Sequence, residues 1–129
     1  MTVPATKASK EIVDGNTSPH KLISLLMAGL LERTDQARHA IAEGNSQDET
    51  ILFEKIVAII HGLRDNLNFE QGGDIAVNLN YLYEYMLERI AKAIELHDAT
   101  EKLSVLAEVH GLMSEVKSGW DGVQEVVAA

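Results

Sequence analysis

The sequence predicts an all-α fold, an antiparallel up-down four-helix bundle that follows a flexible N-terminal arm. Three observations support this prediction. Apolar residues recur every three or four positions in four separate segments, as they do on the buried face of an amphipathic helix. Both prolines, Pro4 and Pro19, precede these segments, so proline bars no later position from a helix. Connections of only a few residues join the segments, which favours antiparallel neighbours.

The composition fits one domain, which we predict at residues 18–129 of the 129-residue chain. Eleven Lys and Arg against 20 Asp and Glu give a net charge of −9, so we expect no nucleic-acid partner. The absence of cysteine excludes disulfides, thiolate catalysis and cysteine metal sites, and it agrees with a cytoplasmic location. Residues 1–18 lack the long apolar run of a secretory signal, and no run of eighteen apolar residues occurs, so we expect neither export nor membrane insertion.

Residues 1–17 mix polar side chains with scattered apolar ones, too few to bury the surface that an ordered segment needs. We therefore predict a flexible arm with one apolar patch, Ile12 and Val13.

The first helix is predicted over residues 19–43. Ser18 can accept a hydrogen bond from a free backbone N–H, and Pro19 suits the first helical position. Gly44 and Asn45 end the helix, because both residue types tolerate the left-handed conformation of a C-terminal cap. Its apolar stripe consists of Ile23, Leu26, Met27, Leu30, Ala37 and Ile41.

The second helix is predicted over residues 47–70, where Ser46 and Glu49 have the spacing of a capping box. It is expected to end near Gly72 and Gly73. Its apolar stripe consists of Leu52, Ile56, Ile59, Ile60, Leu63 and Leu67.

The third helix is predicted over residues 74–97 with Asp74 as its N-cap. Tyr81, Tyr85 and Leu96 lie on a separate apolar arc from the core stripe. Two apolar faces imply two neighbours, or one neighbour and a ligand. The core stripe consists of Ile75, Leu79, Leu82, Met86, Ile90 and Ala93, with Tyr83, Leu87 and Ile94 beside it.

The fourth helix is predicted from residue 100, where Asp98 and Glu101 form a second capping pair. Glycines after Ser118 weaken the helix, while Val127 keeps its phase, so the sequence leaves both ends open. The stripe consists of Val105, Leu106, Val109, Leu112, Met113, Val116 and Trp120.

No pattern typical of catalysis or metal binding is found. The five histidines form neither His-x-x-x-His nor Glu-x-x-His, the spacings that place two ligands on one helix face. The acidic residues fall on polar faces or in first turns, and no Gly-x-Ser-x-Gly motif occurs. Gly72 and Gly73 lack the Lys-Ser/Thr successor of a phosphate-binding loop. We expect no enzyme activity, metal or cofactor.

Two stretches together resemble the flagellar secretion chaperone family, FliS. They are the Ser-Pro-His-Lys-Leu-Ile start at residues 18–23 and the Gly-Gly-x-Ile-Ala-x-Asn-Leu-x-x-Leu-Tyr-x-Tyr-Met run at residues 72–86. A lone tryptophan, Trp120, closes the similar region. The resemblance implies a cytoplasmic bundle without enzymatic activity. It also implies binding of the C-terminal segment of flagellin, prevention of premature polymerisation, and delivery to the flagellar type III export apparatus.

Helical phase selects candidate residues for binding the client that the resemblance implies. Asn78 and Arg89 are expected to make polar contacts that set the register of the client. Packing within the bundle is the competing explanation for the apolar members, because an apolar arc usually meets its own fold first. The candidates are Leu22, Leu25, Phe53, Val57, Asn78, Tyr81, Tyr85 and Arg89.

The family's N-terminal segment is longer and more aromatic, and resembles a client mimic that folds over the groove. Residues 1–17 contain no aromatic residue, so Ile12 and Val13 are the only candidates for a groove cap. Partners implied by the resemblance are flagellin, a component of the export gate and other flagellar regulators. We expect the free protein to be a monomer.

Two other functions remain open from the residues alone. Spare apolar faces also suit a helical adaptor or a self-associating structural protein. A histidine phosphotransfer bundle needs an exposed histidine among small and basic residues. His61, near Gly62 and Arg64, is the best candidate, although its acidic surroundings argue against it.

Overall fold

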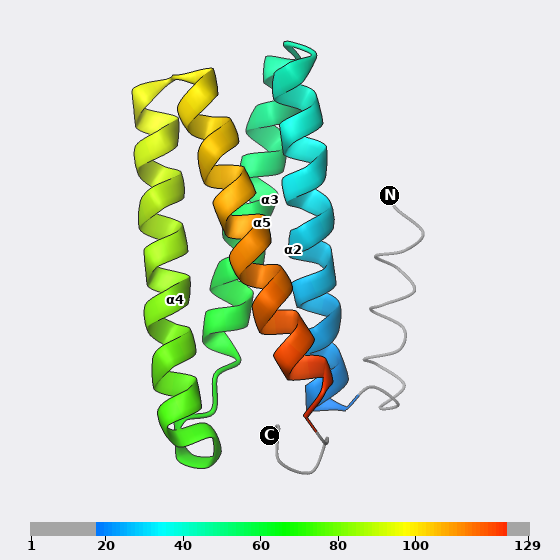
Figure 1. The fold of residues 1–129 in the computed structure, drawn as a ribbon, viewed down its shortest axis with the longest axis vertical. Helices are drawn as coiled ribbons and strands as arrows, with labels where there is room; N and C mark the ends of the chain where they lie inside the picture. The colour runs from blue at the N-terminus through cyan, green and yellow to red at the C-terminus, as the bar shows by residue number, and fades with distance from the viewer. Residues whose placement is uncertain (1–17, 124–129) are drawn as a thin grey trace.

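Four helices run alternately up and down in the computed structural model, which describes residues 18–123 (Figure 1). Each helix packs against two others, so that α2 and α4 lie opposite one another across the core, as do α3 and α5. Within residues 18–123 the chain forms no strand. The predicted all-α up-down four-helix bundle is confirmed. The helices are α2 (Pro19–Ala42), α3 (Ser46–Asp65), α4 (Phe69–Leu96) and α5 (Ala99–Asp121).

Both ends of α2 follow the sequence prediction closely. The Ser18 hydroxyl accepts a hydrogen bond from the backbone N–H of Lys21 at 3.1 Å, and Pro19 occupies the first turn. The helix ends at Ala42, and Gly44 follows with a left-handed φ of 72°. A glycine takes this conformation without steric cost, which explains why the chain reverses here.

The start of α3 and its end differ from the prediction. Asn45, not Ser46, is the N-cap, and its side chain accepts from the N–H of Asp48 at 3.1 Å. The helix ends at Asp65, five residues before the predicted end at residue 70. There the Asn66 side chain donates to the carbonyl of Gly62 at 2.8 Å. Asparagine side chains compete in this way with backbone hydrogen bonds and favour helix ends.

The predicted start of α4 at residue 74 is only partly correct, because a short helical piece from Phe69 precedes it and the N-cap of the whole element is Asn68 and not Asp74. The Asn68 side chain caps the helix by accepting from the N–H of Gln71 at 3.0 Å, so that α4 begins at Phe69. Gly73 then interrupts the element with the non-helical angles φ 51° and ψ −126°, so that a short piece from Phe69 and the long helix that follows Gly73 meet at a kink. Residues with a side chain rarely adopt this backbone conformation.

The start of α5 agrees with the prediction, and its end lies within the range that the sequence left open. Asp98 caps α5 by accepting from the N–H of Thr100 at 3.2 Å, as predicted for this position. The helix ends at Asp121, between the two ends that the sequence left open, and Val127 lies outside the described residues.

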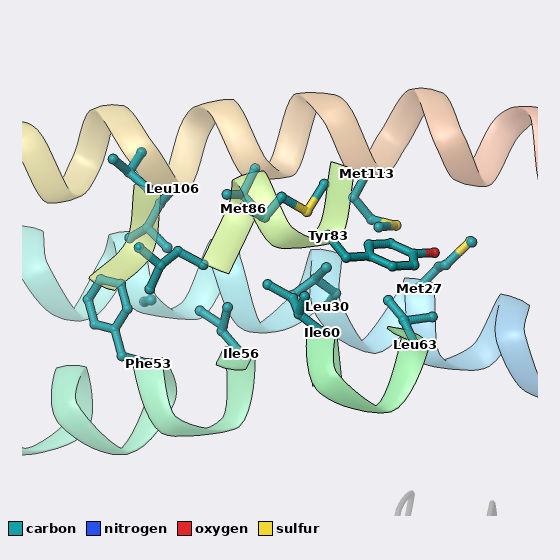
Figure 2. Packing of buried hydrophobic residues seen from close by; sticks show 14 of the residues in the cluster. Met27, Leu30, Phe53, Ile56, Ile60, Leu63, Tyr83, Met86, Leu106 and Met113 are labelled. Atoms are coloured by element: carbon teal, nitrogen blue, oxygen red, sulfur yellow. The ribbon is translucent and has the colours of Figure 1, made fainter. Parts of the chain in front are cut away.

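The core is a continuous cluster of apolar side chains from all four helices (Figure 2). Tyr83 has 1% of its surface exposed, and its ring lies among Met27, Leu63 and Met113 (Figure 2). The phenol oxygen is directed towards the end of the bundle where α2 begins (Figure 2). Tyr83 is the largest fully buried side chain among residues 18–123, so its ring contributes strongly to the packing of α4 against the core.

The predicted core stripe of α4 is only partly correct. Met86, Ile90 and Ala93 are buried as predicted, whereas Ile75 is 65% exposed. Ile75 and Met86 are 11 residues apart, about three turns, so they point to the same side of the helix. Ile75 is therefore exposed because no side chain covers it at this end of the bundle, and not because its phase is wrong.

Replacing Gly73 by alanine is expected to destabilise the bundle by about 1–3 kcal/mol, because a Cβ strains a backbone with φ 51°. The midpoint of thermal unfolding, followed by circular dichroism, should fall by several degrees. Gly111→Ala is the matched control, since this glycine lies inside α5 and a Cβ there meets no atom within 4 Å. The control should raise stability by about 0.5–1 kcal/mol. A neutral effect of Gly73→Ala would contradict the kinked backbone.

Candidate functional site

An open pocket of about 330 Å³ lies at the end of the bundle where α2 begins and α5 ends. All four helices and the connection between α3 and α4 contribute to its lining. The lining is mainly apolar, with a few amide side chains from that connection. Its principal apolar residues are Leu22, Leu63, Leu67, Ile75, Leu79 and Trp120.

The pocket exists because core-phase side chains lack a neighbour at this end. Ile75 and Leu79 belong to the buried side of α4, yet Ile75 is exposed and Leu79 is only partly buried. Leu67, which the sequence assigned to the stripe of the second helix, lies in the α3–α4 connection and also lines the pocket. These apolar side chains remain in contact with water, so covering them with another apolar group would lower the free energy.

One wall of the pocket is held by reciprocal contacts between the start of α2 and the end of α5. The Trp120 indole N–H donates to the carbonyl of His20 at 3.0 Å, and His20 Nε2 donates to the carbonyl of Trp120 at 2.7 Å. The two rings stack with centroids 5.0 Å apart and an angle of 10° between their planes. Asp121 adds a further link, because its carboxylate accepts from the Ser24 hydroxyl at 2.6 Å. Trp120 is thus fixed in the pocket wall rather than free to rotate.

A second surface with exposed aromatic residues runs along α4. Tyr81 is 65% exposed and Tyr85 is 41% exposed. The Tyr85 hydroxyl donates to Glu108 of α5 at 2.5 Å, and Arg89 Nε donates to the same carboxylate at 2.9 Å. The bond from Tyr85, with help from Arg89, lowers the pKa of Glu108, and it raises the pKa of Tyr85.

The structure places the remaining predicted client-binding residues as follows. Leu22 lines the pocket, whereas Leu25 and Val57 are half-buried and are not among the pocket-lining residues. Asn78 is exposed on α4. The prediction for Phe53 needs correction, because Phe53 is 4% exposed and packs in the core with the stripe of α3. A partner can therefore not reach the Phe53 side chain in this structure.

The proposed groove cap, Ile12 and Val13, lies outside the described residues.

Sequence reasoning missed most of the pocket lining. It assigned Leu67, Ile75, Leu79 and Trp120 to buried stripes, because their phase is that of the core. The signal that could have identified them is their position at the ends of helices, where neighbouring helices also begin or end. Helical periodicity predicts which side of a helix faces the core. Whether that side is covered at a given level depends on where the neighbouring helices begin and end.

Other possible sites receive little support from the geometry. His61 is exposed, but the adjacent cation Arg64 is bound to Asn80 at 3.0 Å and to Glu84 at 2.6 Å. No group of three His, Asp or Glu side chains among residues 18–123 could hold a metal ion. In the same range, no helix combines the length and apolar character needed to cross a membrane.

Comparison with known proteins decides the family. The family model of the flagellar protein FliS matches residues 3–127. The chain belongs to the FliS family. The flagellar secretion chaperone FliSB of Pseudomonas aeruginosa is 45% identical over 117 residues, which covers 91% of this chain and 90% of the relative.

Two further relatives support the assignment to the FliS family. The flagellar secretion chaperone FliS of Vibrio cholerae is 39% identical over 106 residues, covering 82% of this chain and 75% of the relative. The chaperone of the same name from Salmonella typhimurium is 35% identical over 106 residues, covering 81% and 76%. These FliS relatives support a role in flagellar export as a chaperone.

The alkaline pH dependence of stability should report on Tyr83. Burial raises its pKa from 10.0 to about 12. The neutral phenol is favoured in the folded state, so its full stabilising effect is present below pH 10 and is lost as the pH rises towards 12. The loss should amount to about 2–3 kcal/mol. Urea unfolding between pH 9 and 12 measures it, with Tyr83→Phe as the control that lacks the ionisable group. Parallel curves for the two proteins would contradict the burial of Tyr83.

Proposed function

We propose that this protein is a flagellin export chaperone. It binds the C-terminal helical segment of flagellin, prevents premature polymerisation and supports delivery to the flagellar type III export apparatus. Membership of the FliS family supports the chaperone role. The observation that carries the proposal beyond the family is the uncovered core-phase surface at Ile75 and Leu79.

The shape of this surface suits a helical client. An amphipathic helix binds by laying its apolar side into grooves between helices, where several side chains each bury a modest area. The pocket and the aromatic surface of α4 both lie on or beside α4, which can guide a client along one helix. Tyr81 and Tyr85 offer large apolar rings with polar tips, a combination that is common at protein interfaces.

Polar groups beside the aromatic surface can set the register of the client. Asn78 is exposed on the same helix, and Arg89 is already held by Glu108 at 2.9 Å. A side chain fixed in this way loses little conformational freedom when a partner binds. We assign Asn78 and Arg89 to register, and Leu22 to apolar contact within the pocket.

We also propose that Ile12 and Val13 act as the groove cap when no client is bound. Only four residues lie between Val13 and Ser18, so the five Cα-to-Cα steps that join them span at most about 17 Å. Pro19 and Leu22, just after this point, both line the pocket. The arm is therefore tethered close to the surface that it is proposed to cover.

A Tyr81→Ala/Tyr85→Ala double variant should retain its helical content but bind a flagellin C-terminal peptide about tenfold or more weakly. Two large side chains would then be missing from the interface, and tenfold corresponds to about 1.4 kcal/mol. Calorimetric titration of the full chain measures the affinity, and circular dichroism measures the helical content.

The matched control is Ile51→Ala/Leu96→Ala. These residues are 43% and 54% exposed and lie at the opposite end of the bundle, at the start of α3 and the end of α4. The control should change the affinity by less than about twofold. Unchanged affinity in the tyrosine variant would remove both tyrosines from the client site. A stable homodimer in light scattering that fails to bind flagellin would favour the self-associating alternative.

A further inference from the structure

The pocket opens because α5 diverges from α4 towards α2 along its length (Figure 1). In the middle of α5, Glu108 accepts hydrogen bonds from Tyr85 and Arg89 of α4. At the end of α5, Trp120 is bound instead to His20 of α2, by hydrogen bonds of 2.7 Å and 3.0 Å. A space therefore remains between the end of α5 and the start of α4, and both of these segments line the pocket.

The chain leaves α5 on the side of the pocket. Gly122 is the C-cap of the helix, and the N–H of Val123 donates to the carbonyl of Trp120 at 3.1 Å. Val123 follows Trp120 by three residues, close to one helical turn, so the two side chains lie on the same side of the chain. Both line the pocket, and Val123 is 37% exposed. Residues 124–129 thus begin at the border of the pocket.

Residues 124–129 are largely apolar. Their sequence is Gln-Glu-Val-Val-Ala-Ala, in which Glu125 is the only charged residue. Valine is among the residues that folded proteins most often bury. Contact of Val126 and Val127 with the open pocket would remove apolar area of both surfaces from water, which lowers the free energy. The segment that follows α5 therefore carries the apolar side chains that the pocket lacks.

The length of the segment and the size of the pocket agree with such a contact. Four Cα-to-Cα steps join Val123 to Val127, so Val127 can reach at most about 14 Å from the pocket wall. The pocket volume of about 330 Å³ is about twice the ~150 Å³ cavity that holds a benzene ring. Two valine side chains therefore fit. So short a connection also leaves few residues to be ordered on docking.

We propose that residues 124–129 fold back into the pocket of the client-free protein, where Val126 and Val127 pack against Trp120 and Leu79. The segment must leave the pocket before a client can cover the same surface, so it lowers the apparent affinity for the client. This competition rests on the proposed function, whereas the docking of the segment does not. A second copy of the chain is a poorer occupant, because two chains of net charge −9 repel one another.

NMR of the full chain without a client tests the docking. We expect nuclear Overhauser contacts between the methyl groups of Val126 and Val127 and the indole of Trp120. This measurement uses the wild type, so it does not depend on the folding of a variant. The absence of these contacts would overturn the inference.

A pair of variants tests which side chains of the segment enter the pocket. Val126→Ser/Val127→Ser should shift the methyl signals of Leu79. The matched control is Ala128→Ser/Ala129→Ser, which adds two hydroxyl groups to the same segment and should leave these signals in place. Equal spectra of the wild type and the valine variant would contradict the proposal.

Calorimetric titration with a synthetic peptide of the flagellin C-terminal sequence tests the competition. The Val126→Ser/Val127→Ser variant should bind the peptide about three- to tenfold more tightly than the wild type, because its pocket is open more of the time. The Ala128→Ser/Ala129→Ser control should differ by less than about twofold. Addition of the peptide to the wild type should also abolish the contacts with Trp120. Persistence of these contacts in the complex would overturn the competition.

Other occupants of the pocket give different results. A shift of the Leu79 signals in Ile12→Ser/Val13→Ser, but not in the valine variant, would assign the pocket to the groove cap and overturn the inference. So would Leu79 signals that change with protein concentration alongside a homodimer in light scattering. Failure of both wild type and valine variant to bind the peptide would refute the proposed function, while contacts between Val127 and Trp120 would still support the docked segment.

Discussion

Burial of one face of α4 is the constraint on which the rest of the structure depends. Tyr83, Met86 and Ile90 pack against the other three helices, and a helix with 3.6 residues per turn cannot bury its opposite side against the same core. Tyr81 and Tyr85 must therefore lie outside, where Tyr85 can meet Glu108 of α5. The aromatic surface is thus a direct consequence of placing Tyr83 in the core.

The start of α4 also accounts for the pocket at the end of the bundle where α2 begins and α5 ends. Asn66 and Asn68 end one helix and begin the next within three residues, and the kink at Gly73 follows one turn later. At this level α2 begins and α5 ends, so α4 presents Ile75 and Leu79 without full cover. Under the proposed function, stability and binding are linked here, because the exposed side chains in core phase are those that the client would cover.

The sequence predicted the architecture well because helix phase and capping are local properties. The hydroxyl of Ser18, the carboxylate of Asp98 and the left-handed Gly44 act within a few residues of themselves. The predicted end of α3 was wrong because two local signals compete there. The double glycine suggested an end, whereas the asparagines at 66 and 68 provide hydrogen bonds that set the end earlier.

The candidate site was less predictable, since exposure depends on tertiary neighbours. Tyr81 and Tyr85 could be selected as candidates for exposed residues from helical phase alone, because they lie off the core stripe. Ile75 has the phase of the core and is nevertheless exposed, while Phe53 was proposed for a groove and is buried. The hydrogen bonds and ring stacking between His20 and Trp120 join residues that are 100 positions apart. No spacing rule in the sequence can indicate such a contact.

The central claim is that a client covers the exposed apolar surface of α4 at the end of the bundle where α2 begins. Methyl NMR spectra of the full chain, recorded with and without an unlabelled flagellin C-terminal segment, test it most directly. The account predicts that the methyl signals of Leu22, Ile75 and Leu79 shift, while those of Ile51 and Leu52 at the opposite end stay in place. Shifts confined to Ile51 and Leu52 would contradict it.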